Sequence, residues 1–580
     1  ITPVSIASGK SLSGSIAVNA GGKLEFSNTG TLASAISMNG GILRANESLT
    51  ISGVVTQTGN ATITVISGKT ITFGNGSIST ESHELRLLGA GTVAFPANAS
   101  GIVVNNAGGL LKLNGTGTLG AAQVTAVSNT GKGLSVNASS TISNLKVAAD
   151  TELNVAASKT LSGAVEVAED KTLTLSGTGT LGSALKLEGT LEAGASLKVT
   201  GLISVADNAT VSIPDANTTL TYSGGNLTVD AYTFSIGGSG TFGNVADSPI
   251  VLAVEDSVLD LTGNGIISGP VRLEGCTLKA SGSPTISGDI TQYDNATIEV
   301  ASGQTLTYSG ASLNLGANEL TLTGGGTFNN SNALVLNNAE SLLSLAGILR
   351  IGDVDGNSAS NSGKGMHVSS SATLGDYDLS AVSYLSLAAN KTLAGQLNLQ
   401  TNGELKTSGD GQYIGDIELA GGKFSANDNQ VLGGTLSITA DSELTVSQGY
   451  SLTLSQAGGL SLGSNMLTLS GGGSLVSGGL TLDTAYSKLL LNLITLDSVS
   501  TTSDSLGLDV DADSTVTSLS VGHTTPVSIA ADKSLSGAIT VTAGSLKLNE
   551  TGTLASSISM SGGVLDADNS LTVSGALTHT

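Results

Sequence analysis

The residues best suited to chemistry in this sequence are the aspartates of two short acidic runs. These runs are Asp509-Val-Asp511-Ala-Asp513 and Asp353-Val-Asp355. Carboxylate oxygens are the ligands that calcium prefers, and the spacing resembles the opening of an EF-hand loop. That loop also needs glycine at its sixth position and glutamate at its twelfth, and neither run has both. We therefore interpret the runs as solvated turns. The five aspartates remain candidates for a loose calcium site, and we expect no other cofactor.

Catalytic groups are sparse and scattered. A carbohydrate-cleaving site on a β-solenoid needs acidic and basic side chains gathered on one face, often beside aromatic platforms for the sugar. This chain has no tryptophan, and its arginines lie far apart, at Arg44, Arg86, Arg272 and Arg350. Its histidines do not pair at metal-ligand spacing: His83, His367, His523 and His579. We therefore expect that the protein is not an enzyme, and we keep a polysaccharide-degrading β-helix enzyme as the weakest of three hypotheses.

The elements that would have to position any such residues are short strands. Apolar and polar residues alternate in Leu173-Thr-Leu175, Val165-Glu-Val167 and Leu397-Asn-Leu399. A period of two indicates a strand with one buried face. Glycine, asparagine and serine punctuate these runs, as they do at turns. No stretch shows sustained helical spacing of apolar residues, so the sequence predicts almost no helix.

A short repeat sets the architecture. An apolar-Ser-Gly phrase returns through the chain, as at Leu12-Ser-Gly14, Ile51-Ser-Gly53, Leu161-Ser-Gly163 and Leu535-Ser-Gly537. Its period of about 20 residues is typical of a solenoid, in which each coil stacks like side chains on those of the last. The six-residue cadence of left-handed helices and the nonapeptides of calcium rolls are both missing. We predict an all-β, right-handed parallel β-helix (a β-solenoid) of roughly 28 coils, with about 20 residues per coil.

Composition limits the partners. Only 12% of the 580 residues are charged, 39% are hydrophobic, and the net charge is −23. A core is therefore expected from valine, leucine, isoleucine and alanine. Nucleic acid is excluded as a partner because phosphate binding needs clustered lysine or arginine. No apolar run approaches the length of a membrane helix, so we expect no transmembrane segment in this chain. The lone Cys276 cannot form a disulfide within the chain.

A second, much longer repeat overlies the first. Thr2-Pro-Val-Ser-Ile-Ala7 returns as Thr525-Pro-Val-Ser-Ile-Ala530, and Thr29-Gly-Thr-Leu-Ala-Ser34 returns as Thr551-Gly-Thr-Leu-Ala-Ser556. We interpret residues 1–523 as one long unit and residues 524–580 as the start of the next tandem unit. Residues 1–580 are then predicted to form one continuous β-solenoid. The chain begins with Ile1 and shows no secretion signal, so we expect it to be a piece of something longer.

These phrases, with the bias toward serine, threonine, asparagine and glycine, resemble the repetitive passenger regions of giant bacterial surface proteins. Autotransporter passengers, filamentous haemagglutinin-like adhesins and extracellular fibres share this pattern. The resemblance implies export and an extracellular location at the bacterial cell surface. Our leading hypothesis is a structural fibre, sheath or stalk whose adjacent repeat units join end to end. The second is an adhesin that binds a host or cell-surface glycan or protein. We also expect lateral self-association through cations that bridge acidic turns.

Overall fold

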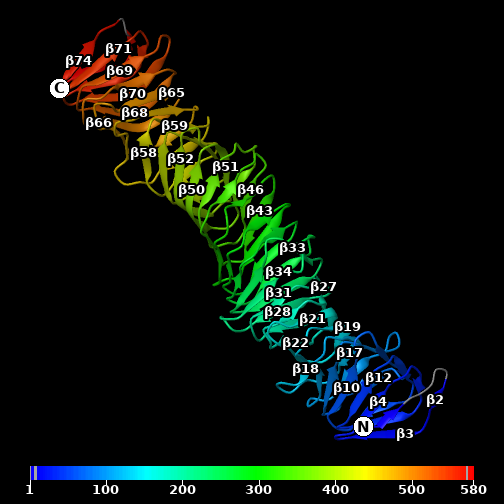
Figure 1. The fold of residues 1–580 in the computed structure, drawn as a ribbon. Coiled ribbons are helices and arrows are strands. Elements are labelled where there is room, and N and C mark those ends of the chain that lie inside the picture. The colour runs from blue at the N-terminus through cyan, green and yellow to red at the C-terminus, as the bar shows by residue number, and fades with distance from the viewer. Residues whose placement is uncertain (1, 5–9, 570–571) are drawn as a thin grey trace. The chain divides into compact units, whose positions relative to one another are not determined.

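The structure is a computed structural model that describes residues 2–4, 10–569 and 572–580. Within these residues the chain forms 76 strands and no helix, and so none that is long and apolar enough to cross a membrane. The predicted fold class is confirmed, because the chain is an all-β parallel β-solenoid of about 28 turns with about 20 residues per turn. The coils succeed one another in sequence order, as the colours of Figure 1 show within each half of the chain.

Two compact units divide the chain, residues 1–291 and residues 292–580. Each unit has its own stack of fourteen parallel strands, which we call the long sheet of that unit, and each of these strands opens a coil. The strands of the first unit are β1 (Thr2–Val4), β4 (Lys23–Phe26), β7 (Ile42–Ala45), β10 (Ala61–Val65), β13 (Glu84–Leu88), β16 (Leu110–Leu113), β18 (Gly133–Val136), β20 (Thr151–Val155), β22 (Thr172–Leu175), β25 (Thr190–Ala193), β28 (Ala209–Ile213), β31 (Thr233–Gly238), β34 (Val258–Leu261) and β37 (Thr277–Ala280).

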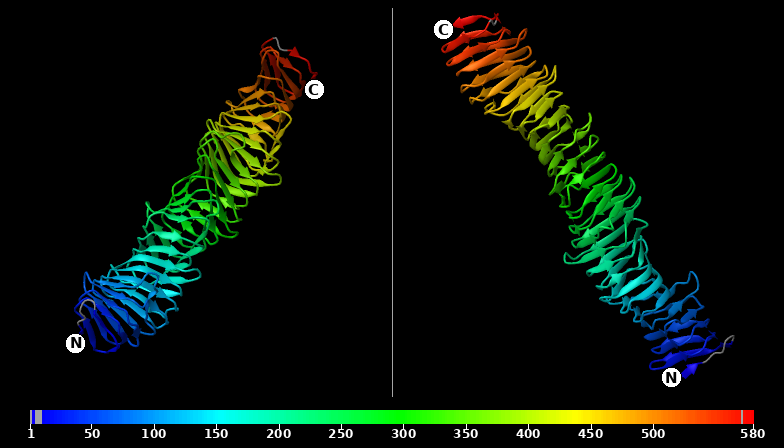
Figure 2. Two further views of the ribbon diagram at one scale, coloured as in Figure 1. Left: turned by 90° about the vertical axis from the view of Figure 1, so that its right-hand side faces the viewer. Right: turned by 45° about the horizontal axis from the view of Figure 1, so that its top comes forward.

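The second unit repeats this arrangement. Its strands of the long sheet are β40 (Ala296–Val300), β43 (Glu319–Thr323), β46 (Leu342–Leu345), β49 (Gly365–Val368), β51 (Val382–Leu387), β53 (Glu404–Ser408), β56 (Lys423–Ala426), β59 (Ser442–Val446), β62 (Met466–Ser470), β65 (Lys488–Asn492), β67 (Gly507–Val510), β69 (Thr525–Ile529), β71 (Ser545–Asn549) and β74 (Val564–Ala567). The two views of Figure 2 show the strands of each unit stacked side by side in chain order.

Two further strands complete a coil and form the other faces. In one coil, β13 is followed by β14 (Thr92–Ala94) and β15 (Gly101–Val104). In the next coil a single long strand, β17 (Thr118–Val124), serves both faces, because its first residues pair with β14 and its last with β15. All described strand pairs within either unit are parallel, as stacking of equivalent strands requires.

Strand alternation separates the core from the surface. In β22, Leu173 and Leu175 are buried while Thr172 and Thr174 are only partly covered. Each inward side chain packs between its equivalents on the coils before and after, and burial of one such leucine contributes about 1.5–3 kcal/mol. Because every coil contacts only its neighbours, stability is close to a sum of coil-to-coil terms.

The core is more aromatic than the composition suggested. We expected valine, leucine, isoleucine and alanine alone, yet several of the chain's few aromatic residues are fully buried, including Tyr222, Phe242, Tyr308 and Phe328. Their rings stack coil on coil, with centroids 6.3 Å apart for Tyr222 and Phe242 and 6.2 Å apart for Tyr308 and Phe328. In both pairs the tyrosine lies two residues beyond the position in register with the phenylalanine, because Phe242 is in register with Leu220 and Phe328 with Leu306.

The recurring apolar-Ser-Gly phrase has a steric cause. Gly163 has φ of 111°, and a Cβ built on it would lie 1.8 Å from the carbonyl oxygen of Ile142 on the previous coil. A Cβ on Gly53 would likewise lie 1.8 Å from the carbonyl oxygen of Ser34. Any side chain there would push two coils apart, so the phrase marks the bend at which one backbone passes closest to the next.

Candidate functional site

The aspartates of the Asp353 run meet other aspartates from the next coil. Asp355 lies in β48 (Val354–Gly356) and is in register with Asp378 of β50 (Ala372–Leu379). Asp353 precedes β48, and its Oδ1 accepts a hydrogen bond of 3.0 Å from the backbone N–H of Asp376. Coil stacking therefore brings together four carboxylates that are distant in the sequence.

Burial and, to a smaller extent, neighbouring negative charge disfavour ionisation of two of these carboxylates. Burial, followed by the charges of Asp378 and Asp353, raises the pKa of Asp355 above its ordinary value. Burial and the same two neighbours also raise the pKa of Asp376. Because the pKa values of Asp355 and Asp376 are higher in the folded state than in the unfolded state, protonation of these two groups favours folding. This stabilisation is complete below the unfolded pKa. It is lost as the pH rises through the folded pKa.

The acidic surface continues over the following coils. On β52 (Thr392–Gln400), Gln396 and Asn398 occupy the equivalent positions, and β55 (Asp416–Ala420) then presents Asp416 and Glu418. We call the six carboxylates on these coils the acidic stripe: Asp353, Asp355, Asp376, Asp378, Asp416 and Glu418. It could attract cations, although among the described residues no group of three or more His, Cys, Asp or Glu is arranged to hold a metal ion.

The three aspartates of the other run have separate surroundings. Asp509 lies in β67 on the long sheet and forms an ion pair of 2.5 Å with Lys488 of the previous coil. Asp511 is exposed just after the strand. Asp513 accepts hydrogen bonds of 2.8 Å from the backbone N–H and 3.0 Å from the hydroxyl of Ser534. The structure thus brings Asp353 and Asp355 together with other carboxylates, whereas Asp509 and Asp513 each engage another partner.

The hydrogen bond from the backbone N–H of Ser534 to Asp513 is one example of a contact that recurs at the corners of the coils. At many corners a short polar side chain accepts a hydrogen bond from a backbone N–H at, or one residue before, the start of a strand on the next coil. Asp150 does so for Thr172 at 2.9 Å, and Asp504 does so for Thr524 at 2.8 Å. These caps satisfy N–H groups that the strand ladders leave over, and they explain why asparagine, aspartate and serine fill the turns.

The remaining candidates for chemistry have ordinary structural surroundings. Arg86 donates to Glu84 on its own strand, and Lys112 of the next coil pairs with the same carboxylate at 3.3 Å. Burial opposes ionisation of Glu84, but these two cations outweigh it and lower its pKa. Cys276 is buried, and burial raises the pKa of its thiol to about 11. A thiol in that state is a poor nucleophile.

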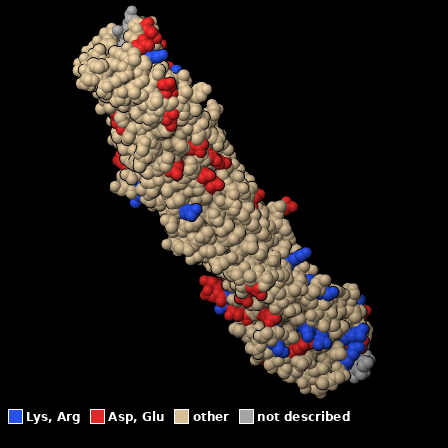
Figure 3. Space-filling view, turned by 90° about the vertical axis from the view of Figure 1, so that its left-hand side faces the viewer, with Lys and Arg blue, Asp and Glu red and all other residues tan. Residues whose placement is uncertain are grey.

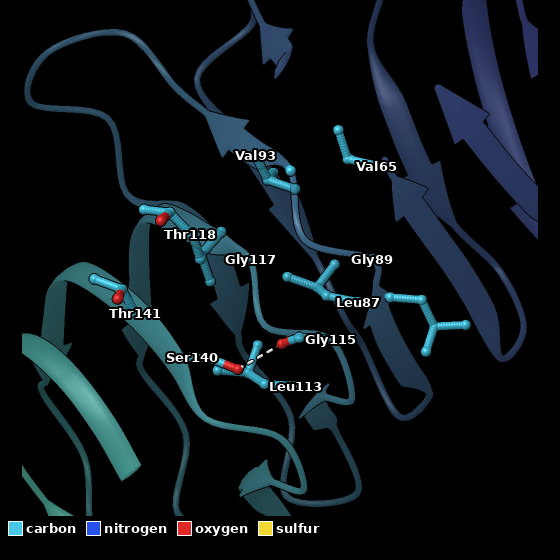
Figure 4. Close-up of a pocket in the computed structure, with 13 residues that line it drawn as sticks. Val65, Leu87, Gly89, Val93, Leu113, Gly115, Gly117, Thr118, Ser140 and Thr141 are labelled. Atoms are coloured by element: carbon cyan, nitrogen blue, oxygen red, sulfur yellow. Dashed lines mark hydrogen bonds between the residues drawn. The ribbon is translucent and has the colours of Figure 1, made fainter. Parts of the chain in front are cut away.

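One hollow between coils is too small for a substrate. The hollow shown in Figure 4 has about 20 Å³ of free volume and lies between successive coils of the first unit. Gly89, Gly115 and Gly117 line it with Leu87 and Leu113, and the hydroxyl of Ser140 donates a hydrogen bond of 2.7 Å to the carbonyl oxygen of Gly115. Such a volume holds about one water molecule.

An open groove of about 430 Å³ crosses the long sheet of the second unit, and the sequence analysis missed it. Glu404, Lys423 and Glu443 occupy one outward position on three successive coils. Lys423 lies 2.9 Å from Glu443 and 4.0 Å from Glu404. Burial opposes ionisation of Glu443, but hydrogen bonds from Lys423, Thr445 and Ser470 outweigh it and lower its pKa. Alternating charge at coil spacing was the signal that could have revealed this groove.

A second open groove, of about 380 Å³, lies in the first unit and is mainly apolar. Its floor carries Ala164 and Ala184 at equivalent positions, with Leu202 at one side. Lys186 and Glu166 border it, and Lys146 pairs with Glu166 at 3.5 Å. Elsewhere charge is thinly spread, and Figure 3 shows one face on which uncharged surface covers most of the area.

No protein-family model matches the chain, and no curated protein or solved structure matches it either.

Proposed function

We propose that this chain is a structural element of an extracellular fibre, sheath or stalk at a bacterial surface, built from tandem units of about 522 residues. The observation that carries the proposal is the stacking at the start of the second copy. Within the second unit, β69 opens that copy and pairs in parallel with β67, which ends the first. Its partners in register are Leu508 with Val527, Asp509 with Ser528, and Val510 with Ile529.

Side chains support the same stacking. The hydroxyl of Thr525 donates a hydrogen bond of 3.1 Å to the hydroxyl of Thr501 on the preceding coil. Asp504 caps the backbone N–H of Thr524, and this hydrogen bond lowers the pKa of Asp504. These contacts are of the same kind as those between coils inside one copy. A repeat that begins without a change of coil pattern suits a protein that serves to span a distance. No special interface has to form at the boundary between two units.

The first experiment is to determine the intact native chain by long-read sequencing of its gene. The proposal expects further units of about 522 residues, with a secretion signal and an anchor at the extremes. A native chain whose ends lie close to Ile1 and Thr580 would contradict the array. A solenoid that binds or cleaves a substrate on its own would then be the better explanation.

Adhesion is the second candidate function, and the groove over Glu404, Lys423 and Glu443 favours it. Neighbouring carboxylate and ammonium groups in an open polar groove offer both acceptors and donors to the hydroxyl groups of a glycan. The test is binding of the purified chain to a panel of surface glycans. Lys423→Ala should abolish binding, whereas Lys488→Ala, at an ion pair outside the groove, is the matched control. Equal binding by all three proteins would exclude this groove as the adhesive site.

Lateral association of fibres through cations is part of the proposal, with the acidic stripe as the surface involved. Treatment of native bundles with EDTA should separate them. Bundles that stay intact in EDTA would remove the cation bridges from the proposal and leave the array itself unaffected.

A further inference from the structure

The two copies of one coil pair carry opposite charges at the same two positions. In the N-terminal copy, Glu25 of β4 is in register with Arg44 of β7. In the C-terminal copy, Lys547 of β71 is in register with Asp566 of β74. The sequences around these positions are closely similar in the two copies. Both members of the pair have therefore changed sign together, so each copy keeps opposite charges at two positions that are in register.

The N-terminal pair is part of a connected network. Glu25 forms an ion pair of 2.7 Å with Lys23, and its other oxygen accepts a hydrogen bond of 2.5 Å from the amide of Asn46. Arg44 donates to Asn46 at 2.8 Å and lies 3.9 Å from Glu25. All four side chains are partly covered by neighbouring coils. The C-terminal copy has Ser545, Lys547, Asp566 and Asp568 at these positions, so its network is replaced as a set.

Repeated units with nearly the same sequence face a general hazard. A coil of one copy can stack on a coil of another copy, within the chain or between chains, and such exchange is a characteristic misassembly of repeat proteins. Here the exchanged arrangement would place Glu25 opposite Asp566 and Lys547 opposite Arg44. Both contacts bring like charges together, and like charges directly opposite on neighbouring strands are destabilising.

We propose that Glu25–Arg44 and Lys547–Asp566 form a pairing code that makes each copy of this coil pair stack with itself and reject its counterpart. The partner rejected is a second copy of the same repeat, and the means of rejection is repulsion between like charges. The inference rests on the proposed tandem array, because an array is where many such copies lie close together while they fold.

The test transplants the C-terminal set into the N-terminal copy. The variant K23S/E25K/R44D/N46D carries the residues that the C-terminal copy already tolerates, so its native coils remain matched. Both copies then carry the same code, and exchange is no longer penalised. The single variant Glu25→Lys is the mismatched control, because it opposes Arg44 in native stacking.

A pair of introduced cysteines detects stacking between coils of different copies during refolding. Ser37 is in register with Thr56 in one copy, and Ser559 is in register with Thr578 in the other. In a Ser37→Cys, Thr578→Cys chain, a short thiol crosslinker joins the two cysteines only when the first coil of one copy stacks on the second coil of the other. Cys276 is replaced by serine in every reporter chain, because burial shields its thiol only in the folded state.

Transplantation should raise the crosslinked yield about tenfold over the native charges, since two like-charge contacts are removed. A second reporter with Ser37→Cys and Thr56→Cys measures native stacking and should give equal yields in the parent and the transplant. An exchange yield that the transplant leaves unchanged would overturn the code. That result would leave the array untouched, because sequencing of the intact gene tests it separately.

Discussion

The N-terminal and C-terminal copies of the repeat show how the same sequence is buried by different neighbours. Leu12 is 41% exposed, while its counterpart Leu535 is 1% exposed. Strand β68 (Ser514–Val521) stacks beneath β70 (Ser534–Val541) and places Ser514 in register with Leu535. The leucine is the same in both copies, so its burial is supplied by the coil before it. The comparison shows that a leucine of this solenoid is buried by the coils packed against its own coil.

Substitution of the shared glycine by alanine should give the largest difference in lost stability between the copies. Gly14 and Gly537 share the same conformation, with φ of 120° and 123°. A Cβ on Gly537 would lie 1.8 Å from the carbonyl oxygen of Val516, whereas nothing lies within 4 Å of one on Gly14. In the isolated 580-residue chain, Gly537→Ala should therefore lower the local stability by more than about 4 kcal/mol, and Gly14→Ala by about 2 kcal/mol from backbone strain alone. Hydrogen exchange at the amides of residues 534–541 and 11–18 measures both losses, and equal losses would contradict the steric account.

Leucine truncation should give the next largest difference. Leu535→Ala removes side-chain atoms from a closed interior and should cost about 3 kcal/mol. Leu12→Ala removes atoms that are partly in water and should cost under about 1 kcal/mol. Hydrogen exchange at the amides of residues 534–541 and 11–18 measures the loss of stability in both variants. A similar cost for the two leucines would show that burial comes from within the coil, contrary to the comparison.

Loss of one corner cap should weaken only the C-terminal copy. Asp513 receives hydrogen bonds from Ser534 at the start of β70, so Asp513→Ala should cost about 1 kcal/mol in that strand. Asp511→Ala, in the same turn and also exposed, is the control and should have little effect. Loosening of residues 11–18 of the N-terminal copy by Asp513→Ala would show that the effect is not local.

Acidification should cause the smallest loss of stability, and it should act on the pair of Glu25 and Arg44 in the N-terminal copy. Hydrogen bonds from Lys23 and Asn46 lower the pKa of Glu25. Because its folded pKa lies below the unfolded value, its contribution is present above the unfolded pKa and is lost as the pH falls through the folded pKa. Amide exchange in residues 23–26 and 42–45 should quicken on acidification, and Glu25→Gln should remove this dependence. A dependence that persists in Glu25→Gln would assign it to another group.

Much of the fold was predictable because each coil repeats a local rule. Alternating residues such as Leu173 and Leu175 fixed strand and buried face, and Gly163 marked a bend that no side chain can occupy. The contacts between coils could not be predicted by adding a fixed repeat length to a residue number. Hydrogen-bonded partners on successive coils lie from 18 to 28 residues apart. Asp355 therefore could not be matched with Asp378, nor Lys423 with Glu443, before the register of the strands was known.

The parallel stacking of Leu508 on Val527 has a consequence for how such a gene can change. A boundary that follows the ordinary coil pattern requires no compensating mutation when a unit is gained or lost. In the tandem array that we propose, unequal recombination between similar copies would then alter the length of the product in whole units while each remaining coil keeps a suitable neighbour. The proposed array therefore predicts that populations of the organism differ in the number of units they carry, with reading frame and fold preserved in each allele.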